Sequence, residues 1–569
     1  MAKTRARRPP ATAFVAAEEE LQPGAAPFPW STMRLTPPTA AAVALFALLV
    51  RVLVSLGSYS GQGTPPMYGD YEAQRHWMEI TLHTPAAEWY RNTTANGLAY
   101  WGLDYPPLTA YQSLAHALLI NASLPQSLAL SSSRGFESHQ SKLLMRWTVL
   151  SSDLLVFFPA AIYFVWVYFQ RNVGGDGEER SAPWFLAMIL LNPSLILVDH
   201  GHFQSVDMTN LYISLILPWF MYVVGPNVTI FNLRTGWVFF LNYPFFQYNC
   251  ISLGFTLGAI AAVLSRNDFA ASALFSLAIN HKQMSLYFAP AFFSHLLGKC
   301  LRRKNPIFEV MKLGFVVIGT FALVWWPYLY SIDSVMEVLN RLAPFERGIF
   351  EDYVANFWCS TSVVIKWKRI FTIHSMKFLS LITTILAFLP SFVRQLKAPS
   401  DQGFLYSLLN NSFSFYLFSY QVHEKSILLP LLPASLLALQ EPRLFGWLMH
   451  CALLSMYPLL CRDRLLLQYG AVLSLFGLIF FPPHGNHVTK ADKLSTKEKA
   501  LIALGLSCSI VLHLVYLSFQ PPKKYPFLIE ALIMFFCFSQ FVAFTIYTNI
   551  KQWMLLDCSS WAVRVKKDL

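Results

Sequence analysis

The chain has 569 residues, of which 55% are hydrophobic, 15% aromatic and only 13% charged, and its mean hydropathy is +0.43. Soluble domains usually carry about 25% charged residues, so this composition excludes a soluble domain and indicates a membrane protein with many spans. The net charge of +12 does not indicate a nucleic-acid partner, because lysine and arginine lie in short loops between apolar runs and no recognition module is present.

The two ends of the chain differ from the apolar part between them. Residues 1–34 carry a basic run and a stretch rich in proline, alanine and glutamate, and we expect them to be disordered and cytosolic. Apolar runs then predict an all-α polytopic membrane domain over 35–548. The tail 549–569 ends in KKDL, whose dilysine fits a retrieval signal on a cytosolic tail and differs from the luminal KDEL type. We therefore expect a multi-pass protein of the endoplasmic reticulum membrane.

The apolar runs predict about fourteen transmembrane helices. With a cytosolic N-terminus, the even-numbered spans return to the cytosol, and the basic loops and the KKDL tail then share that side. The apolar segment 107–124 is not counted, because one more crossing would move every later basic loop to the lumen. We expect it to be an interfacial or re-entrant element of a first luminal loop over 58–145, and we expect a second long luminal loop over 331–375. The predicted spans are 38–57, 146–168, 183–199, 248–265, 268–283, 285–299, 310–330, 376–394, 404–420, 426–440, 444–460, 464–481, 499–519 and 526–546.

Polar and ionisable residues collect in six short motifs, which this topology places on the luminal side. Ionisable groups at a membrane boundary are costly, so these motifs are candidates for function. In chain order they are "GDYEAQRHW" (69–77), "GLDYPPLTAY" (102–111), "DHGHFQ" (199–204), "NHKQM" (280–284), "LAPFERGIFEDYVANFW" (342–358) and "QVHEKSILL" (421–429).

The chemistry that fits these motifs is the transfer of a group to a hydroxyl from a donor held at the membrane face. A lone carboxylate can accept the hydroxyl proton, and histidine, lysine and arginine can neutralise a phosphate leaving group. One carboxylate with a cationic cluster favours inversion by direct displacement, whereas a retaining hydrolase would need two carboxyls about 5 Å apart. A transporter would show internal repeats and polar residues at the span centres, and neither pattern is evident.

Simpler interpretations of the same residues stay open. Asp70 fits the N-cap of a helix. The spacing of His200 and His202 is not that of a helical metal pair, and "HEKS" lacks the second histidine of an HExxH zinc site. Glu351 and Asp352 also fit a solvated luminal helix. No metal site or cofactor is predicted, and a divalent ion stays an open alternative.

The six motifs, in this order, resemble those of the eukaryotic dolichyl-phosphate-glucose glucosyltransferases of the endoplasmic reticulum, from about residue 35 to 550. "EAQRHWMEIT" is similar to the branch that adds the first glucose to the nine-mannose lipid-linked oligosaccharide, whereas the second-glucose branch tends to carry "EVHRNW". The resemblance implies a GT-C fold with luminal chemistry and an α-1,3 linkage formed with inversion. It implies dolichyl-phosphate-glucose, the lipid-linked oligosaccharide and membrane lipids as partners. No nucleic acid is expected, because no recognition module is present, and protein partners stay unknown. The second-glucose enzyme and a polyprenol-sugar transporter stay open as alternatives.

The resemblance also implies the residues of the site. Asp70 matches the acidic residue taken as general base, and His423 matches the histidine placed beside the donor phosphate. Tyr353 stands where many members have lysine, so the resemblance implies no essential cation there. The other expected donor- or substrate-binding residues are Lys425, Glu72, Arg75, His76, Asp104, His200, His202, His281, Lys282, Glu351 and Asp352.

One segment departs from the family pattern. "DHGHFQ" ends at Gln204, and the "YN" that should follow at once begins only at Tyr248, so residues 205–247 interrupt the motif. We interpret them as an alternative-splice product or a gene-model error, and we expect this form to fold poorly or to act weakly.

A form that lacks Ser205–Gln247 should therefore complement glucosyltransferase-deficient cells better than the full chain. The measurement is the glucosylation of lipid-linked oligosaccharide in cells that express each form at equal level. Equal complementation by the two forms would show that the segment is harmless.

Overall fold

The computed structural model describes residues 35–55, 65, 68–172, 181–201, 249–342, 353–420, 422–480 and 495–565. Some sequence predictions concern residues outside this part and stay predictions. These residues are the N-terminal segment 1–34, the interruption 205–247, the KKDL signal, His202, Glu351 and Asp352.

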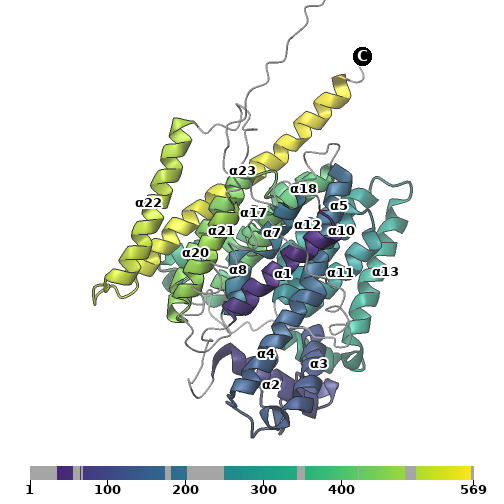
Figure 1. Cartoon of the computed structure of the whole chain (residues 1–569). Coiled ribbons are helices and arrows are strands. Elements are labelled where there is room, and N and C mark those ends of the chain that lie inside the picture. Colours follow the sequence, from purple (N-terminus) through teal and green to yellow (C-terminus); the bar gives the residue numbers. More distant parts are fainter. Residues whose placement is uncertain are drawn as a thin grey trace, which may run out of the picture.

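The described residues fold almost entirely into helices and contain no strand, which confirms the predicted all-α class (Figure 1). The helices are α1 (Pro37–Val54), α2 (Gly69–His83), α3 (Pro107–Ser123), α4 (His139–Ser152), α5 (Phe158–Asn172), α7 (Ala182–Leu190), α8 (Pro193–Ile196), α10 (Asn249–Leu264), α11 (Asp268–His281), α12 (Ala289–Cys300), α13 (Pro306–Trp325), α14 (Ile332–Leu342), α15 (Phe357–Ser362), α16 (Trp367–Ile370), α17 (Ile373–Lys397), α18 (Asp401–Phe418), α19 (Leu428–Leu436), α20 (Pro442–Arg462), α21 (Leu466–Phe480), α22 (Thr496–Ser518) and α23 (Leu528–Val565).

Eight helices in the described part of the chain are long and apolar enough to cross a membrane, judged by length and composition. Each coincides with a predicted span, and the chain is accordingly a membrane protein. Two further predicted spans are the shorter apolar helices α10 and α21. The remaining four predicted spans correspond to α11, α12, α18 and α19, which do not reach this length and apolarity, so the number of fourteen crossings stays a prediction.

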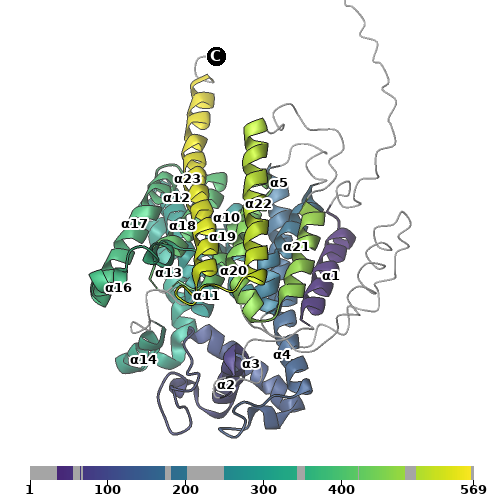
Figure 2. The same ribbon diagram turned by 90° about the vertical axis from the view of Figure 1, so that its left-hand side faces the viewer.

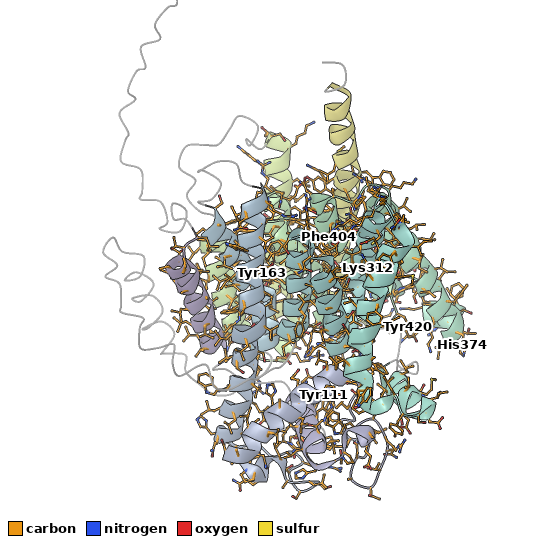
Figure 3. All side chains as sticks on the ribbon, turned by 90° about the vertical axis from the view of Figure 1, so that its right-hand side faces the viewer. Tyr111, Tyr163, Lys312, His374, Phe404 and Tyr420 are labelled. Carbon is orange, nitrogen blue, oxygen red and sulfur yellow. The ribbon has the colours of Figure 1, made fainter. Side chains whose placement is uncertain are left out.

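The helices of the bundle pack closely on one another. At Gly254 of α10, a Cβ atom would come within 3.1 Å of the backbone of Phe157, so this approach requires glycine. Phe404 of α18 is fully buried and packs edge-to-face on Phe292 of α12. Figure 3 shows Phe404 among the bundle helices and Tyr111 beyond the end of the bundle. The main apolar core therefore lies within the bundle.

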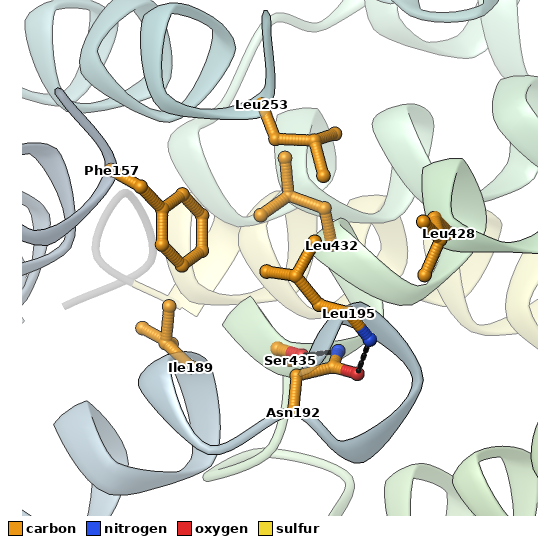
Figure 4. A pocket seen from close by; sticks show the side chains of 8 residues that line it. All are labelled: Phe157, Ile189, Asn192, Leu195, Leu253, Leu428, Leu432 and Ser435. Atoms are coloured by element: carbon orange, nitrogen blue, oxygen red, sulfur yellow. Dashed lines mark hydrogen bonds between the residues drawn. The ribbon is translucent and has the colours of Figure 1, made fainter. Parts of the chain in front are cut away.

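A small cavity lies inside this bundle (Figure 4). Asn192 at its edge caps α8 by accepting hydrogen bonds from the backbone nitrogens of Ser194 and Leu195, and it donates to Ser435 Oγ at 3.2 Å. The other lining side chains are apolar and none is ionisable, so the cavity lacks the groups that glycosyl transfer requires. Those residues are Phe157, Ile189, Leu195, Leu253, Leu428 and Leu432.

Helices α2, α3 and α14 form a smaller unit at one end of the bundle, beside α4 (Figures 1 and 2). We call residues 68–138 together with α14 the end lobe. The segment predicted not to cross the membrane is α3, and it packs against α2 in this lobe. Tyr111 of α3 donates a hydrogen bond to the carbonyl oxygen of Val324 at 2.8 Å, which ties the lobe to α13. The lobe has its own apolar core, to which Tyr328 from the turn after α13 also contributes. Its members within the lobe are Trp77, Ile80, Trp89, Tyr90, Leu103, Ala110 and Val338.

Candidate functional site

Asp70 lies in the first turn of α2. The chain enters this helix through Tyr68 (φ 53°) and Gly69 (φ 67°), a left-handed conformation that is easy for glycine and uncommon for tyrosine. Tyr68 is the N-cap residue, so the alternative in which Asp70 caps the helix is wrong. The positive end of the helix dipole favours the charged carboxylate of Asp70, which keeps 43% of its side-chain surface exposed.

A lysine from the other end of the sequence meets this carboxylate. Lys425 Nζ lies 2.9 Å from Asp70 Oδ2, and its side chain is 26% exposed. Lys425 belongs to the short 3-10 helix Glu424–Ile427, and the ring of His423 caps that helix by accepting a hydrogen bond from the Lys425 backbone nitrogen at Nδ1, at 3.3 Å. Because Nδ1 accepts, a neutral His423 ring carries its proton on Nε2. The "HEKS" motif thus supplies a cation beside Asp70, and its histidine fixes the short helix that carries this cation.

A second lysine approaches the same place from the C-terminal end of α11. The Lys282 ammonium is close enough to Asp70 and Asp104 to interact electrostatically with both, and it lies 5.0 Å from the centre of the Tyr105 ring. The next residue, Gln283, donates a hydrogen bond to the carbonyl oxygen of Asp104 at 3.3 Å. Asp70, Asp104, Lys282 and Lys425 therefore gather at the junction of the end lobe and the bundle, and we call these four residues the charged cluster.

Three of the expected site residues are instead buried inside the end lobe. Arg75 donates two hydrogen bonds of 2.7 Å to the carboxylate of Glu72 and one of 2.7 Å to Glu79 Oε2. His76 Nδ1 lies 3.3 Å from the same Glu79 oxygen, and Tyr100 donates to Glu72 at 2.9 Å. All four charged or ionisable groups of α2 in this set are at most 1% exposed. These residues therefore form a buried ionic network that stabilises the end lobe, and they do not line the exposed surface on which Asp70 lies.

Glu79 makes this network sensitive to acid. Burial opposes ionisation, but the hydrogen bond to His76 and the charge of Arg75 outweigh it and lower the pKa of Glu79 from 4.5 to about 2. A carboxylate with a lowered folded-state pKa stabilises the fold above its unfolded pKa, and this contribution disappears as the pH falls from about 4.5 toward 2.

We therefore expect the melting temperature of the protein to fall between pH 5 and pH 3, with a loss of about 2 kcal/mol from this group alone over that range. The measurement is thermal unfolding of the wild type and of Glu79→Gln over that range. The variant should be less stable at pH 7 but should show a shallower decline, and an equally steep decline would remove Glu79 from the explanation.

The last two expected residues that the structure describes, His281 and His200, are both buried. His281 Nε2 donates a hydrogen bond to Gln112 Oε1 at 2.6 Å. His200 Nε2 lies 2.6 Å from Asp153 Oδ2, and Arg51 Nε lies 2.8 Å from the same oxygen. These contacts join α1 to the two π-helical segments Asp153–Phe157 and Leu197–Gly201. His200 thus hydrogen-bonds to the buried ion pair of Arg51 and Asp153, and it lies next to Asp199, which interacts with Lys282.

Several residues of this region were not predicted from the sequence. Arg51 could have been noticed as an arginine inside the first apolar span, and Glu79 follows Arg75 at the i, i+4 helical spacing. Asp199 and Asn249 stand in motifs that were recognised, but nothing in their sequence context predicts a contact between them. Among the described residues, no three histidine, cysteine, aspartate or glutamate side chains converge as a metal site would require.

Comparison with known proteins gives matches over nearly the whole chain. Residues 47–217 and 231–547 match the model of the "ALG6, ALG8 glycosyltransferase family". The break between the two matched parts, residues 218–230, falls within the predicted interruption 205–247.

Several named relatives also match this chain over most of its length. A protein of Arabidopsis thaliana named "Probable dolichyl pyrophosphate Man9GlcNAc2 alpha-1,3-glucosyltransferase" is 54% identical over 547 residues, which are 95% of this chain and 94% of the relative. The "Dolichyl pyrophosphate Man9GlcNAc2 alpha-1,3-glucosyltransferase" of Rattus norvegicus is 38% identical, over 89% of this chain and 95% of its own. The protein of the same name from Saccharomyces cerevisiae is 36% identical, over 88% of this chain and 89% of its own.

Proposed function

Because the chain belongs to the ALG6, ALG8 glycosyltransferase family, we propose that it transfers the first glucose from dolichyl-phosphate-glucose to the nine-mannose lipid-linked oligosaccharide. The all-helical membrane architecture agrees with the GT-C fold that the sequence resemblance implied. The relatives from plant, rat and yeast are all named for Man9GlcNAc2 as acceptor and for an alpha-1,3 linkage.

The observation that carries the mechanistic part of this proposal is the half-exposed carboxylate of Asp70 between two lysines. The acceptor hydroxyl oxygen attacks the anomeric carbon of the donor glucose, and Asp70 takes the hydroxyl proton. The bond between that carbon and the phosphate oxygen breaks on the opposite face, so the configuration inverts. Dolichyl phosphate leaves with the bonding electrons, and the ammonium groups of Lys282 and Lys425 offset its growing negative charge.

His423 contributes a donor rather than a base in this scheme. Its Nδ1 already accepts the backbone hydrogen bond from Lys425, so its Nε2–H is the group that can bind a phosphate oxygen. Asp104 balances the charge of Lys282. We place the reaction on the luminal side of the endoplasmic reticulum membrane, which is where the sequence topology puts Asp70.

The test is the composition of lipid-linked oligosaccharide in cells that lack the first glucosyltransferase and express this chain. Nine-mannose oligosaccharide should be converted to glucose-bearing forms. Cells that lack the second glucosyltransferase serve as the comparison, because rescue of those cells alone would favour the second-glucose alternative. Persistence of the nine-mannose form at normal expression of the chain would contradict the proposal.

A further inference from the structure

Lys282 is held by a chain of polar groups that starts in the interior of the bundle. Its ammonium donates a hydrogen bond to Asn249 Oδ1 at 2.5 Å. Asn249 Nδ2 in turn donates to Asp199 Oδ1 at 2.6 Å, and the other oxygen of Asp199 accepts the backbone N–H of Cys250 at 3.0 Å. The hydrogen bonds therefore run from the carboxylate of Asp199 through the amide of Asn249 to the ammonium of Lys282.

The folding of the α10–α11 hairpin places these groups together. Asn249 is the first residue of α10, and Lys282 directly follows the last residue of α11. The two helices pack against each other along their length, with a tight turn at the far end where Asn267 caps α11 by accepting from the Ala270 nitrogen. The start of α10 and the end of α11 must then lie side by side.

The donor and acceptor pattern allows the Asn249 amide only one orientation. Lysine can only donate and an ionised carboxylate can only accept. Turning the amide by 180° would place its NH2 group against the Lys282 ammonium and its oxygen against the Asp199 carboxylate. Asp199 thereby determines which end of Asn249 faces Lys282.

Asp199 is itself fixed in place. It is only 2% exposed and lies on the π-helical segment Leu197–Gly201. The next residue, His200, is paired with Asp153, which is paired with Arg51 of α1. Arg51 also donates to the carbonyl oxygen of Leu190 at 2.8 Å. The segment that carries Asp199 is therefore anchored on two sides.

Resting on the proposed function, we infer that Asn249 and Asp199 are positioning residues that hold the Lys282 ammonium where the donor phosphate leaves. A free lysine side chain loses rotamer entropy when it is fixed in one place. It also has two neighbouring carboxylates, Asp70 and Asp104, with which it could pair instead. The amide of Asn249 instead holds the ammonium in one place, from which it can bind the departing phosphate.

The first test is a double-mutant cycle on purified full-length protein with dolichyl-phosphate-glucose and nine-mannose acceptor. Asn249→Leu should lower kcat by about 10- to 100-fold and change KM for the donor by less than about threefold, because the defect lies in the transition state. If Asn249 acts through Lys282, the double variant Asn249→Leu/Lys282→Met should be no slower than Lys282→Met alone. If the fold-loss in kcat of the double variant equalled the product of the fold-losses of the two single variants, the inference would be overturned.

Exchanging the side chains at positions 199 and 249 tests whether the hydrogen-bonded series from residue 199 through residue 249 to Lys282 matters, rather than either residue alone. Asp199→Asn and Asn249→Asp should each be slow, because the first loses the anchor of the amide and the second sets two carboxylates side by side. The double variant Asp199→Asn/Asn249→Asp restores an acceptor for Lys282 and a donor for residue 249, so it should recover most of the lost kcat. Ser252→Ala, in the same hairpin, removes a hydrogen bond to the Ala278 carbonyl oxygen and should keep wild-type kcat.

The last readout does not need glucosyl transfer. Lys282 should react slowly with an amine-directed acylating reagent in the wild type and several-fold faster in Asn249→Leu, measured by mass spectrometry with Lys425 in the same sample as the reference. An unchanged labelling rate would overturn the inference even if the wild type were inactive. An inactive wild type with the expected labelling change would instead contradict only the proposed function.

Discussion

Asp70→Asn is expected to bind dolichyl-phosphate-glucose about as well as the wild type and to transfer glucose about 10²- to 10⁴-fold more slowly. Asparagine has nearly the same shape as aspartate but cannot accept the proton of the acceptor hydroxyl at neutral pH. The loss should therefore appear in kcat. The measurement is single-turnover transfer, together with binding of the donor to the same protein preparation.

The chain offers a closely matched control at the first turn of α18. Asp401 pairs with Arg171 at 2.9 Å, and the exposed fractions of the two side chains equal those of Asp70 and Lys425. Asp401→Asn removes the same charge and the same kind of ion pair, but away from the charged cluster, so its transfer rate should stay normal. Turnover of Asp70→Asn within about twofold of Asp401→Asn would eliminate Asp70 as the base.

Arg75→Met is expected to lower the free energy of unfolding by about 3–5 kcal/mol, the usual cost of removing one partner of a buried ion pair. The substitution leaves the buried carboxylates of Glu72 and Glu79 without their common guanidinium. It also removes the hydrogen bond from Arg75 to the carbonyl oxygen of Ser127. The measurement is equilibrium unfolding in detergent, with proteolysis of the end lobe as a local readout.

Arg91→Met provides the comparison within the same lobe. Arg91 pairs with Glu337 of α14 at 3.0 Å, but both side chains are partly exposed. Exposed pairs of this kind usually contribute about 0–1 kcal/mol, so this variant should unfold much like the wild type. If the two variants lost equal stability, the buried network could not be the main support of the end lobe.

The helices could be predicted from the sequence because each long apolar run had a membrane-type length. The prediction of membrane crossings is limited where the helices are short. The segment 268–299 was expected to cross twice, and its helices α11 and α12 have 14 and 12 residues, less than the roughly 20 that a span ordinarily needs. Length and composition therefore do not determine their topology.

The candidate site was predictable in its members but not in its contacts. Asp70 and Lys425 are 355 positions apart, and no periodicity or spacing relates them. The motifs supplied both residues, and only the packing of the end lobe on the bundle joins them. The same packing separates Asp70 from Glu72, Arg75 and His76, which the sequence had grouped with it. Helical spacing explains the difference, because Arg75 meets Glu72 and Glu79 three and four residues away on the face of α2 that is buried.

The central claim is that this chain adds the first glucose with Asp70 as the base. The most direct measurement supplies purified full-length wild type and Asp70→Asn with dolichyl-phosphate-glucose and, in separate reactions, nine-mannose and once-glucosylated lipid-linked acceptors. The account predicts that the wild type glucosylates the nine-mannose acceptor in an α-1,3 linkage, that it leaves the glucosylated acceptor unchanged, and that Asp70→Asn forms almost no product. Preference for the glucosylated acceptor, or equal product from Asp70→Asn, would contradict it.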